Sequence, residues 1–182
     1  NTYNYSECMN ILEGKKRPGH FLGVITIVHK LFDLIKPDRA YFGEKDYQQL
    51  WLIKLFIKTF KLAIEIKTCK TIRDRNGLAL SSRNKKLTRN ETEQARSLFK
   101  ALDRFRHGVK EQGELDYKDF CALRDNIMET VLCNPIIKLD YFEVIEDENF
   151  SFVSEIKNSK KHRILIAAYI GHTRLIDNML IE

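Results

Sequence analysis

The spacing of apolar residues alternates between helix-like and strand-like along the first third of the chain, which strongly constrains the fold. Over residues 21–36 apolar side chains recur every three or four positions, as on one face of a helix, and Pro37 ends that helix. Residues 39–42 indicate a short strand, residues 46–60 a helix that is apolar on most of its circumference, and residues 62–69 an alternating strand. The order helix, strand, helix, strand predicts a parallel α/β sheet.

The second half of the chain has a different pattern. Polar helices are expected over residues 91–106 and 117–132. Strands are expected over residues 136–144, 163–170 and 174–181, and these three can pair as an antiparallel sheet. The pattern therefore predicts a second domain of the α+β class.

The boundary between the two domains is expected at residues 72–76. Charged residues flank this stretch, and Asn76-Gly77 is a strong turn signal. We therefore assign residues 1–74 to the first domain and residues 75–182 to the second.

The composition limits the class of protein. A hydrophobic content of 43% over 182 residues is enough for a real core and argues against disorder. The net charge of +6 favours an anionic partner without choosing among nucleic acid, a membrane surface and a polyphosphate. No apolar run is long enough to span a bilayer, so we expect a cytoplasmic protein without a membrane partner.

The cysteines are spread along the chain without any C-x-x-C pair. This spacing indicates neither a zinc site nor a disulfide scaffold, and we expect reduced, mostly buried thiols. The four residues are Cys8, Cys69, Cys121 and Cys133.

Residues 43–49 follow the first expected strand and suit a nucleotide site. Gly43 lets the backbone approach a ligand, Lys45 supplies a mobile positive charge for phosphate, and Asp46 can accept hydrogen bonds from ribose hydroxyls. Gln49 lies three positions beyond Asp46 on the same helical face and offers both donor and acceptor to a small polar substrate. The alternative is a plain strand–turn–helix in which Asp46 caps the helix, and the spacing alone favours that alternative.

Residues 77–84 form the second candidate segment. Ser81, Ser82 and Arg83 follow a glycine turn, and their hydroxyls, backbone amides and guanidinium can together wrap a triphosphate. The alternative is a solvated loop in which a serine caps the following helix, and without residues 43–49 the two interpretations are evenly matched. Taken together, the two segments indicate an enzyme that uses ATP at the carboxyl ends of parallel strands.

A third candidate is the basic, glycine-rich stretch over residues 12–21. Arg17 and His20 can touch phosphates at the positive end of the first helix, with Glu13 orienting Arg17. The alternative is a simple turn at the proline–glycine pair with solvated lysines beside it. The remaining histidines form no ligand spacing with cysteines or carboxylates, so we expect no metal held by protein side chains.

Four stretches of the chain together resemble the pantothenate synthetase family, the pantoate–β-alanine ligases. They are LEGKKRPGHF at residues 12–21, KPDRAYFGEKDYQQL at residues 36–50, GLALSSRN at residues 77–84 and LIDN at residues 175–178. They occur in the family's order and span nearly the whole chain. The resemblance implies that residues 1–74 are the C-terminal portion of a Rossmann-like domain that binds ATP and pantoate, followed by a C-terminal lid domain.

The resemblance also implies the reaction. The pantoate carboxylate attacks the α-phosphorus of Mg-ATP and releases pyrophosphate, and the β-alanine amine then attacks the pantoyl adenylate and releases AMP. No covalent protein nucleophile is needed, so catalysis would come from alignment and from stabilisation of phosphate charge. The implied cofactors are ATP and Mg²⁺, the implied state is a homodimer, and no nucleic acid is expected as a partner.

The same resemblance assigns roles by position. The expected ATP-binding residues are Gly43, Glu44, Lys45, Asp46, Ile72, Leu80, Ser81, Ser82 and Arg83. Among them, Lys45 would contact phosphate, Asp46 ribose, and the backbone of Ile72 adenine. Gln49 would bind pantoate, Glu13, Arg17 and His20 would support the site, and the residues expected to act in catalysis are Lys45, Ser81, Ser82 and Arg83.

The chain departs from the family most clearly at its start. The family's N-terminal segment carries a histidine-containing phosphate motif and another pantoate glutamine, and neither has a counterpart before Asn1. Smaller departures are Asn76 for a frequent aspartate and Lys70 for a frequent proline, and both keep a plausible turn. A parallel sheet without its first strands loses half of its nucleotide site. We therefore expect a fragment, or an incompletely represented enzyme, with little ligase activity of its own.

Two other functions remain open at this stage. One is a different adenylate-forming or nucleotidyl-transferring enzyme of the same fold. The other is a basic RNA-binding domain, although the basic residues are interleaved with acidic ones and form no stripe with exposed aromatics.

Overall fold

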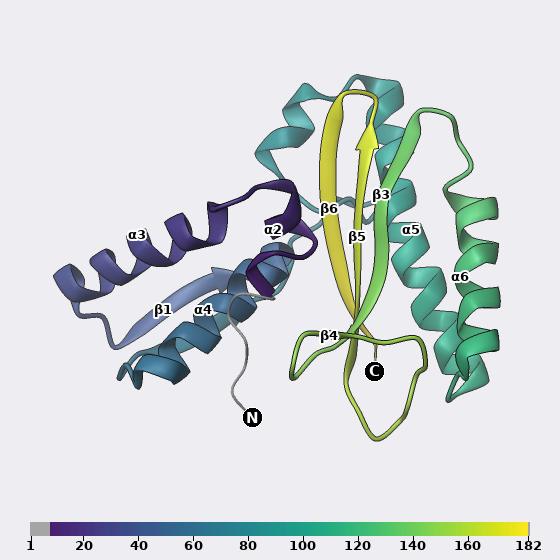
Figure 1. The fold of residues 1–182 in the computed structure, drawn as a ribbon. Helices are drawn as coiled ribbons and strands as arrows, with labels where there is room; N and C mark the ends of the chain where they lie inside the picture. The colour runs from purple at the N-terminus through teal and green to yellow at the C-terminus, as the bar shows by residue number, and fades with distance from the viewer. Residues whose placement is uncertain (1–7, 182) are drawn as a thin grey trace. The chain divides into compact units, whose positions relative to one another are not determined.

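The chain folds as two units, Asn1–Thr71 and Ile72–Glu182, in the computed structural model (Figure 1). The structure describes residues 8–181, so the expectation attached to the start of the chain at Asn1 lies outside the described residues.

A parallel pair of strands lies in the first unit. The strand β1 (Arg39–Gly43) pairs with β2 (Glu65–Cys69), and α4 (Tyr47–Phe60) is the helical crossover that joins them. Parallel neighbours require such a crossover because a short hairpin cannot connect them. The helix α3 (His20–Ile35) precedes β1, which confirms the predicted order of helix, strand, helix and strand.

The helices α3 and α4 both end at a lysine in the left-handed region. Lys36 has φ 50° and donates its backbone N–H to the carbonyl of Phe32 at 2.8 Å, directly before the expected stop at Pro37. Lys61 has φ 52°, and the next amide, that of Leu62, donates to Ile57 at 3.0 Å. Because this helix end occupies the chain beyond Phe60, β2 begins three residues later than predicted.

The helices α3 and α4 differ in burial. The helix α4 is covered on most of its circumference, as predicted, with Leu50, Leu52 and Ile53 almost fully buried. The helix α3 buries only Phe21 and Phe32. The following apolar residues of α3 are exposed instead: Leu22, Ile27, Leu31, Leu34 and Ile35.

The second unit is built on an antiparallel sheet of four strands in the order β4-β3-β5-β6. The strands are β3 (Ile137–Glu146), β4 (Ser151–Phe152), β5 (His162–Ile170) and β6 (Thr173–Ile181). Figure 1 shows the three long strands side by side. The predicted antiparallel sheet is confirmed, while the two-residue strand β4 was not predicted.

Two helices complete this unit. The helix α5 (Arg89–Gln112) packs on β5 and β6, and α6 (Tyr117–Val131) packs on α5. The ring of Phe105 on α5 meets Phe120 of α6 and Phe142 of β3 edge-on, each with ring centroids 5.6 Å apart. One buried aromatic cluster therefore joins both helices to the sheet.

The helix α5 is longer than predicted at both ends. At its start the Thr88 hydroxyl accepts from the Glu91 amide at 3.2 Å, and the Glu91 carboxylate accepts from the Thr88 amide at 2.8 Å. This reciprocal capping box begins the helix at Arg89. At its end, Gly113 follows with φ 82°, a conformation that glycine adopts without strain.

The cysteine prediction is half right. All four thiols are free, as expected. Burial was predicted wrongly, because only Cys8 is buried and Cys121 is half-buried. Cys69, the last residue of β2, and Cys133, two residues beyond α6, are exposed. Within residues 8–181, no helix has the length and apolar character needed to cross a membrane.

Candidate functional site

The carboxyl end of β1 carries the first group of candidate residues. Gly43 is the last residue of the strand, and the single 3-10 turn η1 (Glu44–Asp46) leads from it into α4. The ammonium of Lys45 lies 3.6 Å from the Asp46 carboxylate, and only 18% of the Lys45 side chain is exposed. A largely covered lysine side chain at this edge of a parallel sheet is well placed to meet an anion.

Asp46 does not cap α4 in the way that the alternative interpretation predicted. The 3-10 turn leaves Asp46 at φ −94° and ψ 62°, and its carboxylate makes no capping hydrogen bond to the helix. Because 54% of the side chain is exposed, the carboxylate can accept hydrogen bonds from a ligand.

The basic segment over residues 12–21 lies close to this group. It consists of the short helix α2 (Glu13–Lys16) and the turn into α3, where the Arg17 guanidinium lies 2.8 Å from Nε2 of His20. Burial and the Arg17 charge lower the pKa of His20, while the Glu13 and Asp46 carboxylates act in the opposite direction. His20 is therefore within electrostatic reach of Asp46, and the structure brings the first and third candidate segments together.

Gln48 is a residue that sequence analysis missed. Its amide donates to the carbonyls of Cys8 at 2.7 Å and Ile11 at 3.0 Å, and its oxygen accepts from the Glu13 amide at 3.1 Å. The side chain is buried, so it is the polar attachment of residues 8–13 to α4. The available signal was a glutamine on a helical face that is otherwise apolar.

We predict that Gln48→Leu lowers the free energy of unfolding of the first unit by about 2–4 kcal/mol. Leucine fills a similar volume but leaves two carbonyls and one amide without their partner. Urea unfolding followed by the fluorescence of Trp51, the only tryptophan, measures this unit directly. The matched control is Gln49→Leu at the neighbouring half-buried position, where we expect a change below about 1 kcal/mol. Equal losses in the two variants would contradict this role for Gln48.

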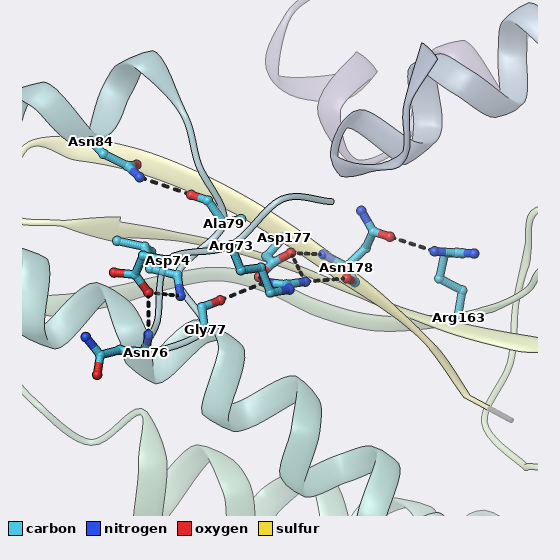
Figure 2. Close-up of polar contacts among 10 residues, drawn as sticks. Arg73, Asp74, Asn76, Gly77, Ala79, Asn84, Arg163, Asp177 and Asn178 are labelled. Atoms are coloured by element: carbon cyan, nitrogen blue, oxygen red, sulfur yellow. Dashed lines mark hydrogen bonds and ion pairs between the residues drawn. The ribbon is translucent and has the colours of Figure 1, made fainter. Parts of the chain in front are cut away.

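The second group of candidate residues starts where the second unit starts. Ile72 accepts a hydrogen bond from the Leu80 amide at 2.9 Å, and Arg73 pairs with Ala79 as an isolated antiparallel bridge. Between them lies a tight turn with Gly77 at φ 90°. Figure 2 shows this turn and the side chains that hold it.

The segment after this turn matches the serine-cap interpretation. The Ser81 hydroxyl accepts from the Arg83 amide at 3.2 Å and caps the 3-10 helix η2 (Ser82–Lys86). The side-chain amide of Asn84 donates to the Ala79 carbonyl at 3.0 Å and closes the loop from the other side. Ser82 and Arg83 remain exposed, so a capped turn and an anion-binding loop are compatible here.

The predicted site residues thus form two groups, one in each unit. The first unit holds Glu13, Arg17, His20, Gly43, Glu44, Lys45, Asp46 and Gln49. The second unit holds Ile72, Leu80, Ser81, Ser82 and Arg83. Ile72 and Leu80 are largely exposed although both are apolar, which suits side chains that flank a ligand. In the described part of the chain, no three histidine, cysteine or acidic residues lie close enough to hold a metal ion.

Comparison with known proteins decides the family. The family model described as pantoate-beta-alanine ligase matches residues 2–180. The chain belongs to the pantoate–β-alanine ligase family. Among relatives in this ligase family, the pantothenate synthetase of Caldicellulosiruptor bescii is 41% identical over 172 residues. That match covers 94% of this chain and 59% of the relative.

Solved structures of the ligase family agree with the fold. Pantothenate synthetase from Thermus thermophilus has a TM-score of 0.83 at 34% identity, over 94% of this chain and 60% of that one. Pantoate-beta-alanine ligase from Francisella tularensis was crystallised with beta-gamma ATP and beta-alanine. It has a TM-score of 0.65 at 40% identity, and the match covers 96% of this chain and 55% of that one. The predicted fold class, a parallel sheet followed by an antiparallel one, is confirmed. The chain spans about three fifths of the length of these ligases.

Proposed function

We propose that the protein carrying these residues condenses pantoate with β-alanine, using ATP, and that this chain supplies part of the active site. The observation that carries the proposal is the largely covered side chain of Lys45 at the carboxyl end of β1, in a chain that matches the ligase family almost throughout. The Francisella relative was crystallised with two of the three substrate types, which supports ATP and β-alanine as ligands here.

The chemistry that we propose has two steps. A pantoate carboxylate oxygen attacks the α-phosphorus of ATP, and pyrophosphate leaves with the electrons of the broken P–O bond. The β-alanine amine then attacks the acyl carbon of pantoyl adenylate, loses a proton, and AMP leaves with the original carboxylate oxygen. The protein's contribution is alignment and charge stabilisation, since neither step requires a protein nucleophile.

Each residue's proposed part in alignment or charge stabilisation follows from its position. Lys45 stabilises the negative charge that develops on the phosphates, and Asp46 accepts from ribose hydroxyls. Arg83 binds phosphate oxygens in a bidentate manner, with the exposed Ser82 hydroxyl beside it. Gln49 hydrogen-bonds pantoate.

The remaining assignments concern the edges of the site. The backbone of Ile72 contacts adenine, and the supporting residues Glu13, Arg17 and His20 lie within electrostatic reach of Asp46. Mg²⁺ would neutralise part of the phosphate charge when ATP is bound.

An isotope experiment tests the adenylate directly. Pantoate labelled with ¹⁸O in its carboxylate should transfer one labelled oxygen to AMP, because the carboxylate oxygen becomes the bridge to phosphorus. The natural polypeptide is incubated with labelled pantoate, ATP and β-alanine, and AMP is analysed by mass spectrometry. Unlabelled AMP, or ADP as the product, would refute the proposed route.

We also infer that a polypeptide of these 182 residues alone is a poor ligase. The matched relatives are covered only to about three fifths of their length, and the described parallel sheet has two strands. We expect pantoate-dependent pyrophosphate exchange at least about 100-fold slower than in a relative of full family length, such as the Caldicellulosiruptor bescii enzyme. Residues that act together in one site lose much more activity than the sum of their separate contributions when part of the site is missing. Equal rates would contradict this inference.

Assembly and location are inferred from the same family membership. We infer a cytoplasmic homodimer, and the exposed apolar residues of α3, such as Leu22 and Leu34, are better suited to an interface than the buried helix α4. Sedimentation velocity of the natural polypeptide measures its oligomeric state.

A further inference from the structure

The Arg73 side chain contacts several groups, whereas an ordinary surface ion pair joins only two side chains. Its two terminal nitrogens donate to the two carboxylate oxygens of Asp177 at 2.5 and 2.9 Å, and also to the carbonyls of Gly77 at 3.0 Å and Asn178 at 3.3 Å. The guanidinium carbon lies 4.8 Å from the ring centroid of Phe99. Asp177 is almost fully buried, so this bidentate pair is well shielded from water (Figure 2).

The Arg73–Asp177 pair supplies hydrogen-bond partners to backbone groups at one edge of the sheet. The strand β6 is the last in the sheet order, so its outer edge has no neighbouring strand in the described residues. At this edge the Asn178 amide donates to the Asp177 carboxylate at 2.8 Å, and the Asn178 carbonyl accepts from Arg73. Backbone groups at a sheet edge need such partners when they are buried.

The same edge is tied to a buried polar network. The Asn178 side-chain oxygen accepts from Arg163 at 2.7 Å, and Arg163 also donates to Asp147 at 2.7 Å. Arg163 is itself buried. Asn178 is therefore held by Arg163 of β5, directly beside the Asp177 carboxylate that binds Arg73.

The turn that follows Arg73 is closed by its own hydrogen bonds. The Asp74 carboxylate accepts from the amides of Asn76 at 2.8 Å and Leu78 at 3.0 Å, and the Asp74 carbonyl accepts from Gly77 at 3.0 Å. A β-carbon at Gly77 would overlap the Phe99 ring, so the turn lies directly against α5. The turn is thus a preformed unit, and Arg73 attaches it to β6 through the Gly77 carbonyl.

We propose that Arg73 and Asp177 are positioning residues for ATP binding, because they hold the turn over residues 73–79 on β6. The turn begins after Ile72 and ends before residues 80–83. The Arg73–Asp177 pair therefore fixes the positions of both the residue proposed to contact adenine and the loop proposed to bind phosphate. This proposal rests on the proposed function, which assigns those flanking residues to ATP.

The test uses Arg73→Lys and Asp177→Asn in the natural polypeptide. Lysine keeps the positive charge but loses the two-pronged bond and the stacking on Phe99, while asparagine keeps the shape of the aspartate. We expect the KM for ATP in pantoate-dependent pyrophosphate exchange to rise about 10-fold, with the KM for pantoate changed less than about 2-fold. We also expect hydrogen exchange at the amides of Asn76, Leu78 and Leu80 to accelerate about 10-fold.

The matched control is Arg174→Lys, which breaks a second Arg–Asp pair on the same strand. Arg174 donates two hydrogen bonds to Asp140 at 2.9 and 3.0 Å and lies 5.9 Å from the Tyr141 ring centroid, with comparable burial. Arg174 and Asp177 are three positions apart on β6 and so face opposite sides of the sheet. We expect Arg174→Lys to lower thermal stability as Arg73→Lys does, without changing the KM for ATP or exchange in the turn.

The outcomes distinguish the positioning role of Arg73 and Asp177 from the proposed ligase function. If the wild-type protein catalyses exchange and Arg73→Lys and Asp177→Asn leave both the KM for ATP and the turn amides unchanged, the positioning role is overturned while the proposed function stands. The same holds if Arg174→Lys raises the KM for ATP equally, because the pair would then be merely structural. A wild-type protein without pantoate-dependent exchange would overturn the proposed function and the ATP role of Arg73, whatever the amides show.

Discussion

Replacing Lys45 with alanine in the natural polypeptide is expected to lower kcat for pantoate-dependent pyrophosphate exchange by about 10²–10³-fold. The side chain lies at the carboxyl end of β1 and is mostly covered, so its charge acts on a ligand with little screening by water. Lys45 has no equally placed substitute on η1, where both other residues are acidic. The loss should appear in kcat because negative charge moves onto pyrophosphate in the transition state.

Lys54→Ala is the matched control for this prediction. Lys54 is an exposed lysine on α4 of the same unit, so its removal costs the same formal charge without touching the end of β1. We expect a change in kcat below about 2-fold and little change in stability. If both variants lose kcat equally while remaining folded, net charge rather than the position of Lys45 matters, and the proposed role is wrong.

Phe105→Ala is expected to lower the free energy of unfolding of the second unit by about 3–5 kcal/mol. The ring is completely buried and touches Phe120 and Phe142 from two other elements. Alanine would remove these edge-on contacts and leave a cavity at the point where α5, α6 and the sheet meet. Urea unfolding followed by far-UV circular dichroism measures the loss.

The same truncation at a partly exposed ring provides the control. Phe152 on β4 is 48% exposed, and Phe152→Ala should cost less than about 1 kcal/mol. If the Phe105 variant lost no more than the Phe152 variant, the aromatic cluster would not be the centre of this unit.

Local patterns were sufficient for most of the fold. The spacing of three and four before Pro37 and the apolar circumference of α4 are short-range signals, and both helices formed where these signals indicate. The strand patterns near residues 163–170 and 174–181 likewise appear as β5 and β6. Burial was harder to predict. The apolar pattern of α3 indicates which face of the helix can be buried, but not how much of that face is buried.

The contacts that hold the site were beyond such patterns. Arg73 and Asp177 are separated by 104 residues, and no periodicity links a residue at a domain boundary to one on the last strand. Gln48 and Cys8 are 40 residues apart, and their contact depends on how residues 8–13 fold against α4. Side-chain partners of this kind are set by tertiary packing, which local spacing does not encode.

The candidate site itself was anticipated in part. Glycine and hydroxyl residues at the ends of strands indicated where ligands gather, and the structure places Lys45 and Asp46 at such an end. The sequence also indicated a turn at Asn76-Gly77, but the residue that closes it is Asp74, whose carboxylate binds two amides. A capping aspartate two residues before an Asn-Gly pair is the signal that would have found it.

The most direct test of the central claim is isotope exchange between pyrophosphate and ATP, measured with the natural polypeptide in the absence of β-alanine. Formation of pantoyl adenylate is reversible, so pantoate alone should support exchange, and omitting pantoate or supplying other small hydroxy acids should abolish it. Exchange that ignores pantoate, or that appears only with a different acid, would contradict the assignment of this chain to pantoate activation.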